Sequence, residues 1–115
     1  MKSFIRKPSV LMAGLFVGLL GATSVASAQS LQIKQWAASC AACHGTDGYS
    51  EGGMASLAGQ NKDAMVKKMI DYKNGKVPGA TIMHQLSKGY TDEQIEKISA
   101  YFAALPAEKP VAKRK

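Results

Sequence analysis

The sequence predicts an all-α domain built from three to five helices. Two observations carry this prediction. Apolar residues recur at helical spacing in several segments, and a complete capping box precedes the last of them. No segment of alternating apolar and polar residues competes as a β-strand. The length of 115 residues leaves room for one domain.

The first predicted helix covers about residues 31–42, and a glycine-rich loop, about residues 45–59, follows it. The apolar stripe of this helix has the spacing i, i+3, i+4 and i+7 and consists of Ile33, Trp36, Ala37 and Cys40. The second predicted helix runs over residues 62–74, because Asn61 can cap its start and Gly75 can stop it.

A short segment, residues 81–88, precedes the last predicted helix. Thr91 and Gln94 form the capping box of that helix. Its apolar stripe consists of Ile95, Ile98, Phe102 and Leu105. The first and last helices each carry one large aromatic residue, Trp36 and Phe102. We therefore expect these two helices to pack together and close the domain.

Cys40 and Cys43 are the only cysteines of the chain, and His44 follows directly. This C-x-x-C-H spacing is the attachment signature of a c-type haem. Thiols three positions apart lie on one side of a helical turn, within reach of both vinyl groups at one porphyrin edge. The imidazole of His44 then reaches the iron as its proximal ligand. The motif predicts one haem c, held covalently by Cys40 and Cys43.

Three other uses of the two cysteines are open to consideration. A thioredoxin-like site needs a βαβ pattern around C-x-x-C, and none is visible. A zinc site needs four ligands, whereas only His44 and His84 accompany the thiols. A short-range disulfide between Cys40 and Cys43 would not explain why a histidine follows the second cysteine. Haem attachment is therefore the preferred interpretation.

Residues 1–28 have the pattern of a secretory signal peptide. Basic residues at the N-terminus are followed by an apolar run of 13 residues, 10–22, and then by Ala26-Ser27-Ala28. We expect cleavage after Ala28 and a periplasmic location, with no stable membrane insertion afterwards. The run is shorter than the roughly 20 residues of a spanning helix. An uncleaved anchor stays an alternative, because no charge follows until Lys34.

The predicted mature chain has 87 residues and a formal net charge of +4. Residues 29–105 are expected to form the haem domain, and residues 106–115 a flexible basic tail. A domain of this size has a marginal core, and a covalently held haem would complete it. Export argues against nucleic acid as a partner, and a modestly basic surface suits an acidic partner protein.

The second axial position of the iron separates electron transfer from small-molecule chemistry. The candidate methionines of the mature chain are Met54, Met65, Met69 and Met83. Met65 and Met69 share an apolar helical stripe, which is more typical of core packing than of ligation. Met83 has enough chain behind it to reach the face opposite His44. His84 is its rival, and an open site is the third alternative.

With these ligands placed, the chain resembles the small bacterial class I cytochromes c. The resemblance rests on Cys40-Ala41-Ala42-Cys43-His44-Gly45, Leu57-Ala58-Gly59-Gln60, and the helix from Thr91 to Phe102. It implies the class I cytochrome c fold and places the axial methionine of the family at Met83. Family members commonly carry a proline at the position of Ala55, and the carbonyl of that residue accepts a hydrogen bond from the haem histidine.

Ala80-Thr81-Ile82-Met83 and Lys88-Gly89-Tyr90 are similar to the cytochrome subunit of flavocytochrome c sulfide dehydrogenase. This similarity implies an electron-transfer protein, not an enzyme in itself, that accepts electrons from the flavin of a sulfide-oxidising partner. The single C-x-x-C-H allows one haem only. The alternatives are a freely diffusing class I cytochrome c of a respiratory chain, and an open-site haem peroxidase or gas-binding protein.

Overall fold

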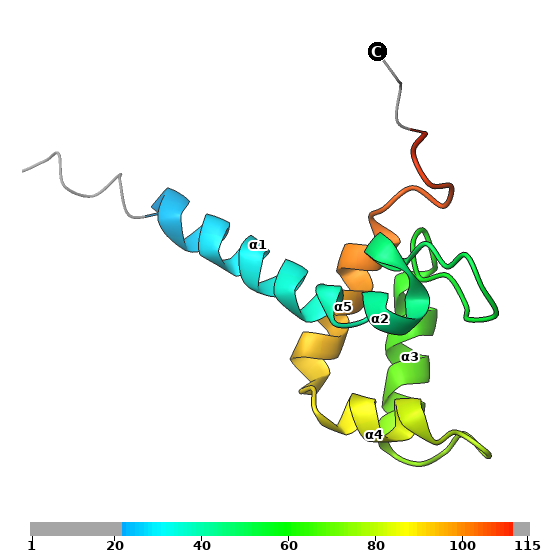
Figure 1. Cartoon of the computed structure of the whole chain (residues 1–115). Helices are drawn as coiled ribbons and strands as arrows, with labels where there is room; N and C mark the ends of the chain where they lie inside the picture. The colour runs from blue at the N-terminus through cyan, green and yellow to red at the C-terminus, as the bar shows by residue number, and fades with distance from the viewer. Residues whose placement is uncertain (1–21, 112–115) are drawn as a thin grey trace, which may run out of the picture.

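A computed structural model describes residues 22–111 of the chain, all of them helical or irregular (Figure 1). The elements are α1 (Ala22–Ala38), α2 (Ala41–His44), the 3₁₀ turn η1 (Thr46–Gly48), α3 (Lys62–Lys73), α4 (Ile82–Lys88) and α5 (Asp92–Ala103). No strand occurs within these described residues. The predicted all-α class is therefore confirmed, with the helix arrangement of a class I cytochrome c.

Helix α5 lies at the centre of the domain and packs against both α1 and α3 (Figure 1). The buried cluster between α1 and α5 consists of Ala37, Ile98 and Phe102. Trp36 and Tyr90 pack against this cluster from its edge. The predicted pairing of the first and last helices is thus confirmed. Helix α4 lies at the far end of α3 and packs against that helix.

The predicted signals for the starts of α3 and α5 are present in the structure. Asn61 caps α3, since its side-chain Oδ1 accepts the backbone N–H of Ala64 at 2.9 Å. In α5 the Thr91 hydroxyl oxygen accepts the Gln94 N–H at 3.1 Å, and the Gln94 side chain accepts the Thr91 N–H at 2.9 Å. These reciprocal bonds satisfy amide groups that have no partner inside a helix.

The predicted end of the first helix is wrong. The sequence predicts one helix over about residues 31–42, whereas α1 begins at Ala22, nine residues earlier, and ends at Ala38, and a separate helix, α2, begins at Ala41. The Ser39 hydroxyl donates to the Trp36 carbonyl at 2.7 Å. The Cys40 amide donates to the Ala37 carbonyl, three residues back, at 3.1 Å, and not to the Trp36 carbonyl as in a continuous α-helix. Serine hydroxyls compete with backbone amides for helix carbonyls in this way, and α1 therefore ends before the cysteines.

The predicted signal peptide, residues 1–28, falls largely outside the described residues, which begin at residue 22. Helix α1 runs continuously past Ala28, the predicted cleavage point. Cleavage itself stays a prediction. Among the helices in residues 22–111, none combines the length and the apolar character that crossing a membrane requires.

The segment after α5 makes specific contacts with the loop between η1 and α3. Tyr49 donates its hydroxyl proton to the Pro106 carbonyl at 2.8 Å, and Lys109 forms an ion pair with Glu51 at 2.6 Å. Residues 106–109 therefore lie beside this loop (Figure 1). The end of the predicted flexible tail, residues 112–115, is outside the described part of the chain.

Candidate haem site

The C-x-x-C-H motif forms a helix of its own. Cys40 occupies the N-cap of α2, and Cys43 and His44 lie in its last turn. Both cysteines are free thiols, Cys40 half-buried and Cys43 exposed. Burial raises the pKa of the Cys40 thiol. The two cysteines and His44 therefore belong to one short helical segment.

Gly45 ends α2 with a positive φ of 80°. A Cβ atom at this position would lie 2.1 Å from the Tyr49 carbonyl oxygen. Only glycine allows the backbone to turn so closely here. The turn sends the chain into the loop that runs back beneath His44.

The imidazole of His44 is fixed by that loop. Its Nδ1 atom lies 2.7 Å from the Ala55 carbonyl oxygen. Because a carbonyl oxygen only accepts, Nδ1 carries the proton and Nε2 keeps its lone pair. An outer hydrogen bond of this kind sets the tautomer and orientation of a metal-binding histidine. The hydrogen bond that the family resemblance implied for Ala55 is confirmed, although the residue is not proline.

Met83 lies in the first turn of α4 and is half-buried. Its carbonyl accepts the hydroxyl proton of Ser87 at 2.6 Å, and Ser87 is fully buried. The backbone of α4 is therefore held where Met83 begins the helix. The assignment of Met83 as an iron ligand stays a prediction.

His84, the rival ligand, is anchored to the end of α3. Its Nδ1 atom lies 2.7 Å from the Tyr72 carbonyl oxygen. A Cβ atom on Gly75 would lie 3.3 Å from the Cε1 atom of His84. The imidazole therefore packs against the turn that follows α3, with Nδ1 protonated and Nε2 keeping its lone pair, as at His44.

The other candidate methionines differ in their surroundings. Met65 packs against the core cluster of Ala37, Ile98 and Phe102, and Met69 is half-buried on α3. Both positions match the core role expected from the apolar stripe. Met54 is 56 % exposed in the loop that carries Ala55.

Two large apolar side chains of α4 are exposed to solvent. Ile82 and Leu86 of α4 are 65 % and 52 % exposed, and they precede and follow Met83 in the sequence. Helix α4 packs against α3, whereas α2 packs against α1 and η1. A flat apolar macrocycle attached to Cys40 and Cys43 would give such side chains an apolar partner. The thiols, the oriented imidazole and these apolar groups all fit a haem.

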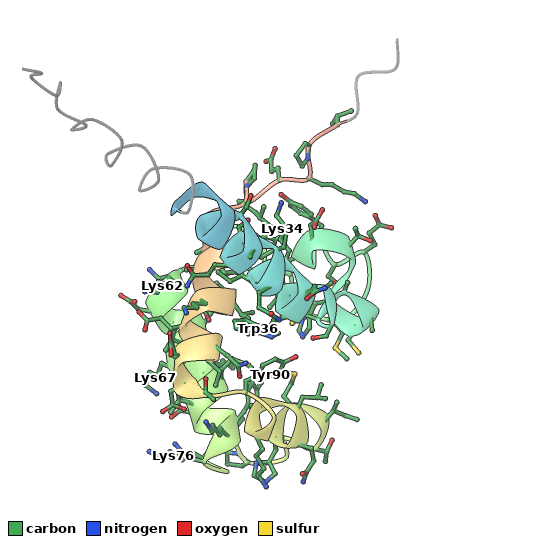
Figure 2. The ribbon with its side chains drawn as sticks, turned by 90° about the vertical axis from the view of Figure 1, so that its left-hand side faces the viewer. Lys34, Trp36, Lys62, Lys67, Lys76 and Tyr90 are labelled. Carbon is green, nitrogen blue, oxygen red and sulfur yellow. The ribbon has the colours of Figure 1, made fainter. Side chains whose placement is uncertain are left out.

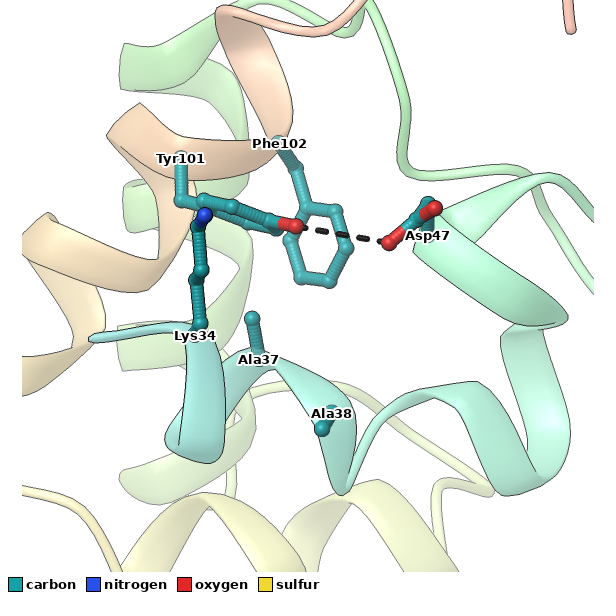
Figure 3. Close-up of a pocket in the computed structure, with 6 residues that line it drawn as sticks. All are labelled: Lys34, Ala37, Ala38, Asp47, Tyr101 and Phe102. Carbon is teal, nitrogen blue, oxygen red and sulfur yellow. Dashed lines mark hydrogen bonds between the residues drawn. The ribbon is translucent and has the colours of Figure 1, made fainter. Parts of the chain in front are cut away.

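A separate pocket of about 240 Å³ lies between α1, η1 and α5 (Figure 3). It is lined by Lys34, Ala37, Ala38, Asp47, Tyr101 and Phe102. The Tyr101 hydroxyl points across it to Asp47 Oδ1 at 3.4 Å (Figure 3). Burial and the charge of Asp47 raise the pKa of Tyr101. None of the four predicted haem residues lines this pocket.

One part of the site was missed by the sequence analysis. Tyr90 follows α4, and its hydroxyl lies 2.7 Å from the hydroxyl of Ser39, the residue before Cys40. Lys73 of α3 donates to the Tyr90 carbonyl at 2.9 Å. No pattern of spacing marks residues 39, 73 and 90 as neighbours, because their contact depends on how three helices pack.

Comparisons with known proteins agree with this geometry. Residues 33–102, more than half of the chain, match the family described as cytochrome C oxidase, cbb3-type, subunit III. The chain is 43 % identical over 67 residues to a cytochrome subunit of sulfide dehydrogenase from Chlorobaculum tepidum, covering 58 % of this chain and 60 % of that protein. The predicted resemblance to such a subunit is thus confirmed at the level of sequence similarity.

Two further relatives are cytochromes of other kinds. The chain is 38 % identical over 94 residues to cytochrome c4 of Pseudomonas aeruginosa, covering 78 % of this chain and 44 % of that protein. It is 35 % identical over 71 residues to cytochrome c-554(548) of Halomonas halodenitrificans, covering 56 % of this chain and 82 % of that protein.

The chain spans 60 % of the length of the sulfide dehydrogenase subunit and 44 % of the length of this cytochrome c4. The match to the family model covers the segment from α1 to α5 that contains the C-x-x-C-H motif, Ala55 and Met83. Because that match extends over more than half of the sequence, the chain belongs to the family described as cytochrome C oxidase, cbb3-type, subunit III, and is a cytochrome c with one covalently attached haem c.

Proposed function

We propose that this cytochrome is an exported single-electron carrier whose haem is held by Cys40, Cys43, His44 and Met83. The observation that carries the proposal is the 2.7 Å contact between His44 Nδ1 and the Ala55 carbonyl oxygen. It leaves Nε2 as the free imidazole donor beside two free thiols. The bound haem would supply one-electron exchange between ferric and ferrous iron.

The proposed role of Met83 rests on the family resemblance, which places the axial methionine at this residue, and on the chemistry of a thioether. Met83 is half-buried in the first turn of α4, and the neighbouring His84 directs its Nδ1 atom to the Tyr72 carbonyl oxygen. A thioether also favours ferrous iron and so raises the reduction potential, which suits an electron acceptor. With both axial positions filled, the iron would have no free site for a substrate.

Variants of these side chains test the ligand assignment in purified holoprotein. Ferric wild-type protein is expected to be low-spin, with the weak long-wavelength absorption band of sulfur ligation. Met83→Ala should lose this band and bind cyanide readily. His84→Phe and Met54→Leu should keep it. Loss of the band in His84→Phe, or a high-spin wild-type spectrum, would refute Met83 as the ligand.

We further propose that the electron donor is the flavin of a sulfide-oxidising protein. The support is the similarity of the chain to the cytochrome subunit of sulfide dehydrogenase from Chlorobaculum tepidum. A tagged chain, purified from its own host, should carry a partner with flavin absorbance. Added sulfide should then reduce the haem of the purified complex. Purification of the chain alone, together with no reduction by sulfide, would overturn this assignment.

A freely diffusing carrier is the second candidate function. It is favoured by the fact that the chain spans 82 % of the length of cytochrome c-554(548) but 60 % of the sulfide dehydrogenase subunit. The purification described above separates the two candidates, because a free carrier elutes without a flavoprotein.

Export is a separate part of the proposal, since it rests on the signal pattern of residues 1–28. The mature protein should begin at Gln29 and should be recovered from the periplasmic fraction. Sequencing of the N-terminus would check both points. A mature protein that still begins at Met1 and sediments with membranes would support the uncleaved anchor instead.

A further inference from the structure

Two hydroxyl groups connect the end of α1 with the end of α4. The Tyr90 and Ser39 hydroxyl oxygens are 2.7 Å apart, although the residues are 51 positions apart in sequence. Ser39 also donates to the Trp36 carbonyl at 2.7 Å. A serine hydroxyl has a single proton, so the proton between the two oxygens comes from Tyr90. The bonds form a chain from Tyr90 through Ser39 to Trp36, and such chains strengthen each member.

The backbone of Tyr90 is fixed from a third element. Lys73 of α3 donates to the Tyr90 carbonyl at 2.9 Å and forms an ion pair with Asp92 at 2.7 Å. The Tyr90 ring packs against the core cluster of Ala37, Ile98 and Phe102. In Figure 2, Tyr90 lies near Trp36, between α1 and α4. The phenol is therefore held at its backbone, its ring and its hydroxyl.

The Tyr90–Ser39 contact connects two parts of the candidate haem site, which we call the cysteine half (Cys40, Cys43 and His44) and the methionine half (α4 with Met83). Ser39 immediately precedes Cys40, while Tyr90 lies two residues past the end of α4, the helix that carries Met83. Helix α4 packs against α3, not extensively against α1 or α2. The hydrogen bond between Tyr90 and Ser39 is thus a direct connection between the cysteine half and the methionine half.

We propose that Ser39 and Tyr90 form a hydroxyl clamp that positions α4 so that Met83 stays bound to the iron. The proposal rests on the proposed function, because it takes Met83 as the axial ligand. Tyr90 acts here as a positioning residue and does not itself contact the iron. Without the clamp, α4 moves away more often, and an external ligand competes more successfully for the iron.

The test measures imidazole binding to ferric holoprotein, since imidazole must displace the thioether of Met83. Removing one hydrogen bond should favour the displaced state by roughly two- to tenfold. The apparent Kd for imidazole should therefore fall by that factor in Tyr90→Phe and in Ser39→Ala. Because both changes remove the same bond, the double variant should bind no more tightly than the single variants.

Two matched controls separate the clamp from general effects. Tyr101→Phe removes a phenol hydroxyl whose partner is Asp47, and it should leave the imidazole Kd at the wild-type value. Ser39→Thr keeps the hydroxyl and should also bind imidazole like the wild type. Each variant retains most of its side chain, so folding should be preserved, and circular dichroism checks this.

The outcomes distinguish the clamp from the proposed function. If wild-type protein shows the sulfur band but Tyr90→Phe has an unchanged imidazole Kd, the clamp is refuted and Met83 ligation stands. Additive effects in the double variant would also refute the clamp. If wild-type protein lacks the sulfur band, the assignment of Met83 fails, and the clamp proposal fails with it.

Discussion

His44 Nδ1 lies 2.7 Å from the carbonyl oxygen of Ala55, eleven residues further along the chain. The contact ties the histidine of α2 to the loop that precedes α3. It fixes which imidazole nitrogen is protonated and how the ring is turned. The loop residue supplies only its backbone for this purpose, so the interaction does not depend on the identity of its side chain.

Ala55→Pro should stabilise the holoprotein by about 0.4–1 kcal/mol, because proline restricts the unfolded chain while the carbonyl remains. In the described part of the chain the Ala55 amide donates no hydrogen bond that proline would remove. Thermal unfolding should show a melting temperature a few degrees higher. Ala58→Pro is the matched control, since the Ala58 amide donates to Gly48 at 3.3 Å, and it should destabilise. A lower melting temperature for Ala55→Pro would show that this backbone does not accept proline.

Cys40→Ser and Cys43→Ser should each yield little stable protein. A domain this small depends on the covalently held haem to complete its core. The yield of protein that keeps its haem after denaturation measures the effect. Ala42→Ser places the same hydroxyl on the exposed side of α2 and should keep a normal yield. Near-normal helicity by circular dichroism in the haem-free double variant would contradict the coupling of folding to haem attachment.

Gly48→Ala should destabilise the protein by about 2–5 kcal/mol. Gly48 has a positive φ of 77°, which costs other residues roughly 1–2 kcal/mol. An added Cβ would also lie 2.9 Å from the Phe102 ring and 3.0 Å from Leu57 Cβ, and such overpacking costs about 1–3 kcal/mol. Gly52→Ala is the control, because a Cβ at Gly52 meets nothing within 4 Å. Equal denaturation midpoints for the two variants would contradict this account.

Lys109→Ala should raise the pKa of the Glu51 carboxyl group. Lys109 holds that pKa below its ordinary value of 4.5 through a hydrogen bond and its charge. A lowered carboxyl pKa stabilises the fold above the ordinary value, and this contribution is lost as the pH falls through the folded-state pKa. The variant should therefore be slightly less stable than wild type at neutral pH and equally stable in strong acid.

Nuclear magnetic resonance titration of Glu51 measures this shift directly. The stability change should be small, because both groups are exposed to solvent. An unchanged Glu51 pKa in Lys109→Ala would show that the segment after α5 does not stay beside the loop in solution.

The sequence could specify several features that depend on neighbours along the chain. The capping box of Thr91 and Gln94 and the Asn61 cap lie within single turns, so their residue types were sufficient to predict them. The C-x-x-C-H motif is likewise local, because one helical turn sets the distance between its thiols. The buried stripe of α5 followed from its helical period.

The sequence reading failed where two local preferences competed. It continued the first helix to residue 42, but the Ser39 hydroxyl takes the Trp36 carbonyl and the helix stops at Ala38. The spacing of apolar residues does not show where the helix ends, because the end depends on which hydrogen bonds the Ser39 hydroxyl forms. One of these partners, Tyr90, comes from a distant element.

The sequence alone determined the helical class, the starts of α3 and α5 and the haem motif, since each arises from contacts between residues a few positions apart. The tertiary structure decided that His84 turns to the end of α3, that Lys109 meets Glu51, and that Tyr90 reaches Ser39. These pairs are 12 to 58 residues apart, and only the packing of helices brings them together. The physical reason is that side-chain hydrogen bonds act over about 3 Å, whereas spacing in the sequence gives no distance between separate helices.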